Sequence, residues 1–178
     1  EIEVVLKEIE PYVDEIQRYK NGLQNGNQDI KQYIPDVINE INDIIPGEGF
    51  KIHMNELTHD LRIIGAKVPY NYPILLEDQE SLFGYLRYTD EMIETMIANV
   101  ATDVMYVKDD VGFIYFPGWV NQIGEMKPGE GYYCKLVSNP SNPVTLIYPN
   151  TVTKTYNLPM EKPEISYYQD YFKTYNTM

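Results

Sequence analysis

Between residues 80 and 150, the chain alternates short apolar runs with clusters of turn residues. Residues 82–87 have the composition of a strand, and apolar residues from Met92 to Ile97 follow Thr89-Asp90 at helical spacing. The other apolar runs predict strands at 104–107, 113–116, 133–136 and 144–148. The pattern therefore predicts an α+β unit in which one short helix packs on a curled antiparallel sheet.

The first 69 residues have a more helical pattern. Pro11 should interrupt the first helical stretch, and Pro35 stands near the first turn of the second. The apolar residues at helical spacing are Ile2, Val5, Leu6, Ile9, Val13 and Ile16 in the first stretch, and Ile34, Val37, Ile38 and Ile41 in the second. A coiled-coil stalk is less favoured, because the prolines and residues 21–27 break any sustained heptad.

One phrase of the sequence occurs twice: Pro46-Gly47-Glu48-Gly49-Phe50 recurs as Pro128-Gly129-Glu130-Gly131-Tyr132. A strand-like run follows each copy, at 51–54 and at 133–136. Tight turns are predicted at both places, since glycine adopts a positive φ without steric cost. The residues predicted to form them are Pro46, Gly47, Gly49, Pro128, Gly129 and Gly131. A phosphate-binding loop is not favoured, because the Lys-Ser/Thr that follows such a loop is missing.

The residues upstream of the phrase match more loosely. Residues 9–20 resemble 97–108, whereas the first copy has a longer connection before its turn and lacks a counterpart of 82–87. We therefore expect two related modules in tandem, residues 1–69 (incomplete at its N-terminus) and residues 70–150. Residues 151–178 have no helical period and are expected to form an extended arm, donated to a neighbouring subunit, or the start of a following domain.

Charge narrows the class of partner. The chain has 27 acidic and 14 basic residues, a net charge of −13, which argues against binding to nucleic acid or to anionic lipid. The sequence has no apolar run of membrane-spanning length, so membrane insertion is not predicted. Its single cysteine forms no internal disulfide.

The candidates for catalysis or metal binding are weak. His53 and His59 are six positions apart, which is not a metal-binding spacing. Cys134 corresponds to Ile52 in the first copy, and both are expected at inward-facing core positions. Asp109 and Asp110 are predicted in a hairpin turn, with calcium binding as a minor alternative. We predict no enzyme and no cofactor.

Aromatic side chains are the remaining candidates for binding, although a position in the core is favoured for Trp119. The chain has 17 Tyr, five Phe and one Trp, a composition that suits half-buried strands and contact surfaces. If a sugar is bound, the predicted contact residues are Trp119, Tyr115, Tyr132 and Tyr133.

The stretch from Leu82 to Leu136 resembles a module of long surface proteins of Bacteroidetes-type bacteria and their phages. The phrases that carry the resemblance are Ser81-Leu82-Phe83-Gly84-Tyr85, Val107-Lys108-Asp109-Asp110-Val111-Gly112-Phe113-Ile114-Tyr115-Phe116-Pro117, and Asn121-Gln122-Ile123-Gly124-Glu125-Met126-Lys127-Pro128-Gly129-Glu130-Gly131-Tyr132. The Trp-Asn of the family's opening strand is missing here, and the first copy is expected to lack the Tyr-x-Pro strand. The resemblance implies a repetitive scaffold, as in adhesins and phage tail fibres, without catalytic residues.

These observations predict an extracellular, non-enzymatic protein. The first hypothesis is a structural or receptor-engaging segment of a viral tail, fibre or virion surface, whose partners are copies of itself, for example in a trimer, or neighbouring structural proteins. The alternative is a bacterial cell-surface adhesin or a carbohydrate-binding accessory module that binds a host-surface glycan.

Overall fold

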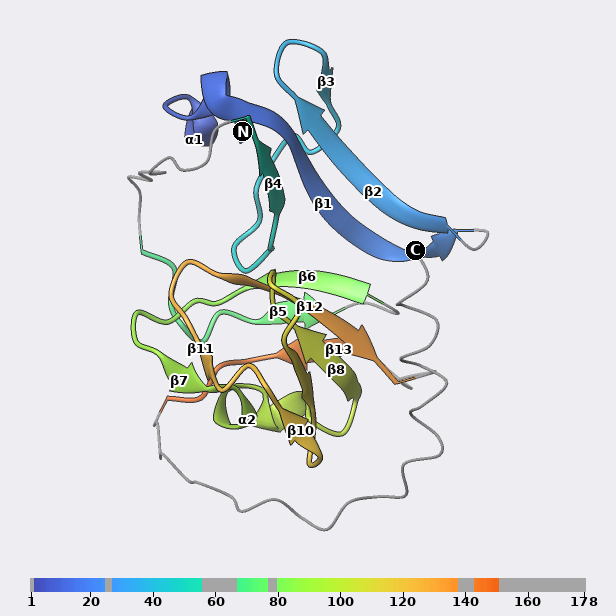
Figure 1. Cartoon of the computed structure of the whole chain (residues 1–178), viewed down its shortest axis with the longest axis vertical. Coiled ribbons are helices and arrows are strands. Elements are labelled where there is room, and N and C mark those ends of the chain that lie inside the picture. Colours follow the sequence, from blue (N-terminus) through green and yellow to red (C-terminus); the bar gives the residue numbers. More distant parts are fainter. Residues whose placement is uncertain (1, 25–26, 56–66, 77–79, 138–142, 151–178) are drawn as a thin grey trace.

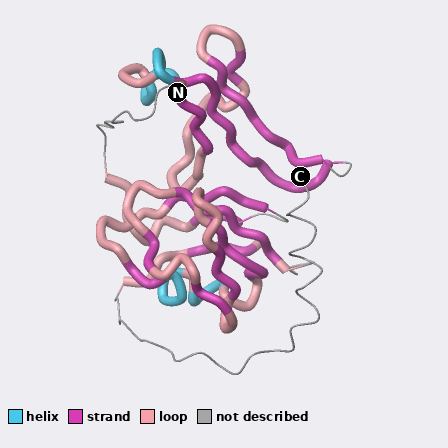
Figure 2. The backbone as a smooth tube through the Cα atoms, in the orientation of Figure 1, coloured by secondary structure: helices cyan, strands magenta, loops and turns pink. Residues whose placement is uncertain are grey.

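The computed structural model describes residues 2–24, 27–55, 67–76, 80–137 and 143–150, and strands dominate this part of the chain (Figure 2). Its helical segments are α1 (Ile2–Leu6), η1 (Glu10–Tyr12), α2 (Ile93–Met96) and η2 (Ala98–Val100). The predicted α+β class is therefore wrong, and the protein is mostly β. The stripe from Met92 to Ile97 forms a single α-helical turn, because the backbone tightens into a 3-10 helix directly after it.

The strands form two larger sheets and two small ones (Figure 1). The first sheet has the order β3-β2-β1-β4, the second has the order β10-β9-β8-β12-β6, and β11-β7 and β13-β5 are two-stranded. In the first sheet the strands are β1 (Val13–Gln24), β2 (Asn27–Ile34), β3 (Ile38–Asn39) and β4 (Lys51–Met54). The others are β5 (Ile74–Leu76), β6 (Glu80–Gly84), β7 (Glu91–Met92), β8 (Val104–Lys108), β9 (Ile114–Phe116), β10 (Val120–Asn121), β11 (Glu125–Met126), β12 (Gly131–Leu136) and β13 (Val144–Leu146).

The two larger sheets correspond strand by strand, with one exception. β3-β2-β1-β4 matches β10-β9-β8-β12, and β6 is an additional strand beside β12. A short α-helix and a 3-10 helix precede β1 as they precede β8. We call the elements from α1 to β4 the first copy, and β6 together with the elements from α2 to β12 the second copy.

Hydrogen bonds recur at fixed spacings in the two copies. The matching backbone donor–acceptor pairs include Ile2–Asn42 and Ile93–Gly124, Val37–Ile34 and Trp119–Phe116, Glu40–Gln32 and Gln122–Ile114, and Asn55–Tyr12 and Val137–Asp103. The Oδ1 atoms of Asn39 and Asn121, 82 positions apart, accept equivalent backbone bonds at 2.9 and 2.7 Å. Between 33–55 and 115–137 this spacing is constant, and eight of the 23 residue pairs are identical. The copies therefore share one backbone design.

The helix predicted over Ile34 to Ile41 is wrong. This segment is the end of β2, a turn and β3, and Tyr33-Ile34-Pro35 occupies the place of Tyr115-Phe116-Pro117. The first copy therefore does contain the Tyr-x-Pro strand that it was expected to lack. Asp36 and Asn42 have positive φ values of 61° and 56°, as Gly118 and Gly124 do in the second copy, and a helix cannot contain such residues.

The predicted N-terminal helix is present only as α1. Pro11 lies in η1, and the chain then continues as the long strand β1. β1 and β2 form a hairpin that is longer than the one formed by β8 and β9 in the second copy (Figure 1). This hairpin is the longer connection that distinguishes the first copy.

Each copy has its own cluster of buried apolar residues. One cluster runs from Ile2 to Ile41 and the other from Ile74 to Tyr148. All residues of the predicted arm 151–178 lie outside the described residues. The module boundaries after residues 69 and 150 stay predictions.

Candidate functional site

The repeated phrase forms the same turn in both copies. The N–H of Glu48 donates to the carbonyl of Ile45 at 3.1 Å, and the N–H of Glu130 donates to the carbonyl of Lys127 at 3.2 Å. Gly47 and Gly129 both have a φ of 85°. With proline before the glycine, this geometry is a type II turn, which explains the shared Pro-Gly pair.

The turn of the first copy is attached to the second copy through its backbone. The N–H of Gly84 donates to the carbonyl of Gly47 at 2.9 Å, and the N–H of Gly49 donates to the carbonyl of Leu82 at 3.1 Å. These two bonds flank a bridge between Glu48 and Phe83. We call this contact between residues 47–49 and strand β6 the joint.

The joint has no room for side chains on its glycines. A Cβ on Gly47 would lie 2.6 Å from Cγ1 of Ile74, and one on Gly49 would lie 2.7 Å from Cγ of Leu82. The first turn is therefore pressed against β5 and β6. By contrast, a Cβ on Gly129 would meet nothing within 4 Å in the described part of the chain.

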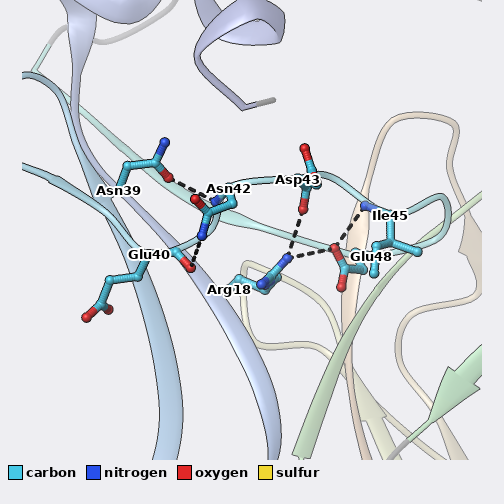
Figure 3. A network of polar contacts seen from close by, with 7 residues as sticks. All are labelled: Arg18, Asn39, Glu40, Asn42, Asp43, Ile45 and Glu48. Carbon is cyan, nitrogen blue, oxygen red and sulfur yellow. Dashed lines mark hydrogen bonds and ion pairs between the residues drawn. The ribbon is translucent and has the colours of Figure 1, made fainter.

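An ion pair supports the first turn (Figure 3). Arg18, on β1, donates from Nη1 to the carbonyl of Asp43 at 3.0 Å and to Oε2 of Glu48 at 3.3 Å. The same Glu48 oxygen accepts the N–H of Ile45 at 3.1 Å. The two side chains are 8% and 19% exposed, so the pair is shielded from solvent and ties the β1–β2 hairpin to the turn.

The second copy uses its glutamate differently. Tyr132 Oη donates to Oε2 of Glu130 at 2.6 Å and accepts the N–H of Lys127 at 2.9 Å. The first copy has Phe50 in place of Tyr132, so its glutamate has no phenol to bind, and Arg18 takes that role. The sequence pattern did not indicate Arg18, because it lies in the longer hairpin of the first copy.

The structure divides the four aromatic residues predicted to bind sugar. Tyr115 and Tyr132 are 4% and 0% exposed and belong to the core of the second copy. Burial raises the pKa of the Tyr115 phenol to about 12, with Glu94 adding to the effect, and burial also raises the pKa of Tyr132. Of these four residues, Trp119 and Tyr133 are only partly buried and offer aromatic surface to a ligand.

Trp119 lies at the end of a row of rings. Its ring is 5.3 Å from that of Phe116, which is 5.9 Å from that of Tyr106. Tyr133 lies opposite Lys108 on the neighbouring strand, with the ammonium group 5.2 Å from the ring centroid. This arrangement offers stacking surface but no convergent set of polar groups.

The remaining candidates have structural roles. Cys134 is 1% exposed, and burial raises the pKa of its thiol to about 12, so it is not a nucleophile at neutral pH. Asp109 Oδ1 accepts the N–H groups of Gly112 and Phe113 at 2.8 and 2.7 Å, as expected for a turn. His53 is half-buried on β4, whereas His59 lies outside the described residues.

Ile52 departs from its predicted inward-facing core position. It is 37% exposed, whereas Cys134, its counterpart, is 1% exposed. Ile52 lines an apolar groove of about 290 Å³ between the two copies. We call this the β4 groove. Its walls include Ile2, Leu6, Ile16, Phe50 and Ile52 of the first copy and Gly84, Gly129, Glu130 and Gly131 of the second.

The described residues contain no group of three His, Cys, Asp or Glu side chains placed to hold a metal ion. None of their helices combines the length and apolar character needed to cross a bilayer.

No protein-family model, curated protein or solved structure matches this chain. The features of the described residues that bear on function are the joint, the β4 groove and the partly exposed aromatic rings.

Proposed function

We propose that this chain is a non-catalytic repeat segment of an extracellular fibre, a phage or virus tail, or another virion-surface protein, with a structural or receptor-engaging role. Its partners are then further copies of the same module or neighbouring structural proteins. The observation that carries the proposal is the joint, in which one copy is attached to the next by backbone hydrogen bonds.

The joint supports this proposal because it connects consecutive copies of a repeat, as in proteins that extend by adding repeats. Two copies with the same backbone design are connected in sequence, and the turn of the first contacts the opening strand of the second. Such repeats stabilise each other mainly through contacts between neighbours, so that a chain of them extends in one direction. Backbone hydrogen bonds to a strand edge are also a recurring way in which one segment binds to a sheet.

Immunogold electron microscopy tests the proposal. Antibodies raised against the purified chain would be applied to the source cells and to virus particles released from them. The proposal expects gold along tails, fibres or other surface projections, and pre-immune serum provides the control. Label confined to the cell interior would refute it.

The exposed rings favour a second candidate, a bacterial cell-surface adhesin or carbohydrate-binding module. Trp119 and Phe116 are only partly buried, and their ring centroids are 5.3 Å apart, so together they offer a stacking surface for sugar rings. A glycan array would compare the unmodified chain with Trp119→Ala and with Phe113→Ala, which removes another exposed ring. Binding that is lost only in Trp119→Ala would favour this candidate, and absence of binding above background would exclude it for the glycans tested.

A further inference from the structure

We propose that the face of the second sheet that points away from the core binds an acidic glycan, whose sugar rings carry carboxylate or sulfate groups. This inference rests on the proposed function, in which the chain has a receptor-engaging role, and it names the chemical class of the receptor. We call the residues that carry it the outer face, and they are Tyr106, Lys108, Phe116, Trp119, Tyr133 and Lys135.

The strand register places these residues on one side of the sheet. Val107 and Cys134 are paired and belong to the core of the second copy, where they are 0% and 1% exposed. Their neighbours along β8 and β12 therefore point to the opposite side, since side chains alternate along a strand. The pairs on that side are Lys108–Tyr133 and Tyr106–Lys135.

Aromatic rings continue across the outer face onto β9. The ring centroids of Tyr106 and Phe116 are 5.9 Å apart, and those of Phe116 and Trp119 are 5.3 Å apart. Phe116, Trp119 and Tyr133 are only partly buried. The C–H face of a sugar ring can pack on such rings, so the outer face offers stacking surface along more than one strand.

Two lysines lie among these rings. The ammonium group of Lys108 is 5.2 Å from the ring centroid of Tyr133, and Lys135 is diagonal to Lys108 across the β8–β12 pair. Both lysines are partly exposed. The register also places Glu80 of β6 opposite Lys135, so this side of the sheet has two positive charges against one negative charge. In a chain with a net charge of −13, this local excess of positive charge favours an anionic ligand.

The first copy shows that the fold does not require these side chains. Its strands pair in the same register, and the positions of the two outer-face pairs are taken by Gln17–Lys51 and Glu15–His53. Glu15 accepts hydrogen bonds from Nε2 of Gln17 at 3.0 Å and from Nε2 of Gln32 at 2.7 Å, so this surface is polar. The copies share a backbone design, and the rings and lysines of the second copy therefore indicate a ligand.

The combination of rings and charges selects among anionic ligands. A nucleic acid has a negative charge on every nucleotide and would be repelled by the many acidic residues of this chain. An acidic peptide can pair with lysines without placing a ring on the aromatic residues. An acidic glycan offers both groups, an apolar ring face for the aromatic residues and a carboxylate or sulfate for the lysines.

The experiment titrates the full chain with short oligomers and measures binding by isothermal titration calorimetry. The acidic sugar probes are a hexamer of galacturonic acid and a sulfated hexamer of galactose, which distinguish carboxylate from sulfate. The unmodified galactose hexamer is the neutral control. A hexamer of glutamic acid and a hexamer of thymidylate provide charge on a peptide and on a nucleic acid.

Two double variants differ in position but not in charge. Lys108→Gln with Lys135→Gln removes both lysines of the outer face. Lys51→Gln with Lys127→Gln removes two exposed lysines outside it and is the matched control, because both variants lose two positive charges. Circular dichroism confirms that each variant is folded. If the outer-face double variant does not fold, Lys135→Gln is compared with Lys51→Gln.

A pair of aromatic variants tests the stacking. Phe116→Leu removes a ring of the outer face and keeps an apolar side chain. Phe113→Leu is its control, because Phe113 is 55% exposed in the β8–β9 turn, outside the outer face.

The unmodified chain should bind at least one acidic sugar hexamer, and bind the other three hexamers at least about tenfold more weakly. Loss of the two outer-face lysines should weaken binding about tenfold or more, because two charge-assisted contacts are removed. Phe116→Leu should weaken binding about fivefold. The two control variants should bind as the unmodified chain does.

Absence of binding to both acidic sugar hexamers would overturn the proposal, as would a preference for the neutral hexamer. Equal binding of the glutamate or thymidylate hexamer would also overturn it, and so would equal losses in the two double variants, since the chain would then respond to charge alone. None of these results would change the immunogold labelling, so failure of this inference and failure of the proposed function are distinguishable.

Discussion

The joint makes a quantitative prediction about two glycines that differ only in what surrounds them. Gly47 and Gly129 have the same φ of 85° in the same turn. Alanine at either position must adopt a left-handed backbone conformation, which costs about 1–2 kcal/mol. Gly129→Ala should therefore lower the free energy of unfolding by about that amount and by little more, since its methyl group would meet nothing within 4 Å in the described residues.

Gly47→Ala carries an additional steric cost. Its methyl carbon would lie 2.6 Å from Cγ1 and 3.0 Å from Cδ1 of Ile74, which is 5% exposed. Overpacking of this kind costs about 1–3 kcal/mol. The total loss expected for Gly47→Ala is therefore about 2–5 kcal/mol, and the difference between the two variants measures the contact across the joint.

Urea unfolding followed by two signals tests this prediction. Far-UV circular dichroism reports the whole chain, and the fluorescence of Trp119, the single tryptophan, reports the second copy. If the joint couples the copies, Gly47→Ala should shift both transitions. In a chain that already carries Ile74→Ala, the cost of Gly47→Ala should fall to that of Gly129→Ala, because the clash is gone. Equal losses for the two glycine variants, within about 0.5 kcal/mol, would refute the reasoning.

Three further predictions concern single side chains. Arg18→Met should lower the free energy of unfolding by about 2–4 kcal/mol in urea titrations, because removing one ion of a shielded pair leaves the other uncompensated. The loss should be smaller in a chain that carries Glu48→Gln, and equal losses in the two backgrounds would contradict this. Cys134 should resist iodoacetamide at pH 8 until the chain is unfolded, and rapid labelling of the native chain would contradict its burial. The free energy of unfolding should fall as the pH rises from about 9 to about 12, because the unfolded state releases the thiol proton at a lower pH than the folded state. Asp109→Ala should lower the melting temperature more than Asp109→Asn, which keeps an acceptor oxygen for the N–H groups of the turn. Similar losses in the two variants would show that these hydrogen bonds do not stabilise the turn.

Several parts of the fold could be predicted from the sequence because their signals are local. The strand of residues 51–54 was predicted with the bounds of β4, and the Pro-Gly pairs correctly marked tight turns. The stretch from Ile34 to Ile41 failed for a physical reason. Its apolar residues fall at helical spacing, but they do not share a buried face, since Val37 is 73% exposed while Ile41 is 1% exposed. The stronger signal was the match of Tyr33-Ile34-Pro35 to Tyr115-Phe116-Pro117, which requires the two copies to be aligned 82 positions apart.

The joint could not be predicted in this way. It consists of backbone bonds between residues 47–49 and 82–84, which are distant in sequence, and backbone groups leave no trace in amino-acid type. The glycines are the only residues whose identity reflects the contact, and the same glycines are required by the turn itself. The role of Arg18 could not be predicted either. Its partner Glu48 has a counterpart in the second copy, Glu130, and that glutamate binds a tyrosine instead of an arginine. The repeat could be recognised from sequence, but the contact between its copies could not.

The differences between the copies also indicate what supports the joint. In the first copy the long hairpin brings β1 alongside β6, and Arg18 on this hairpin holds the turn through Glu48. The second copy has the short β8–β9 hairpin, and its glutamate is bound by Tyr132 of the same turn. The joint of the first copy is therefore supported by the hairpin and the ion pair in addition to its backbone bonds, and the turn of the second copy has neither of these supports.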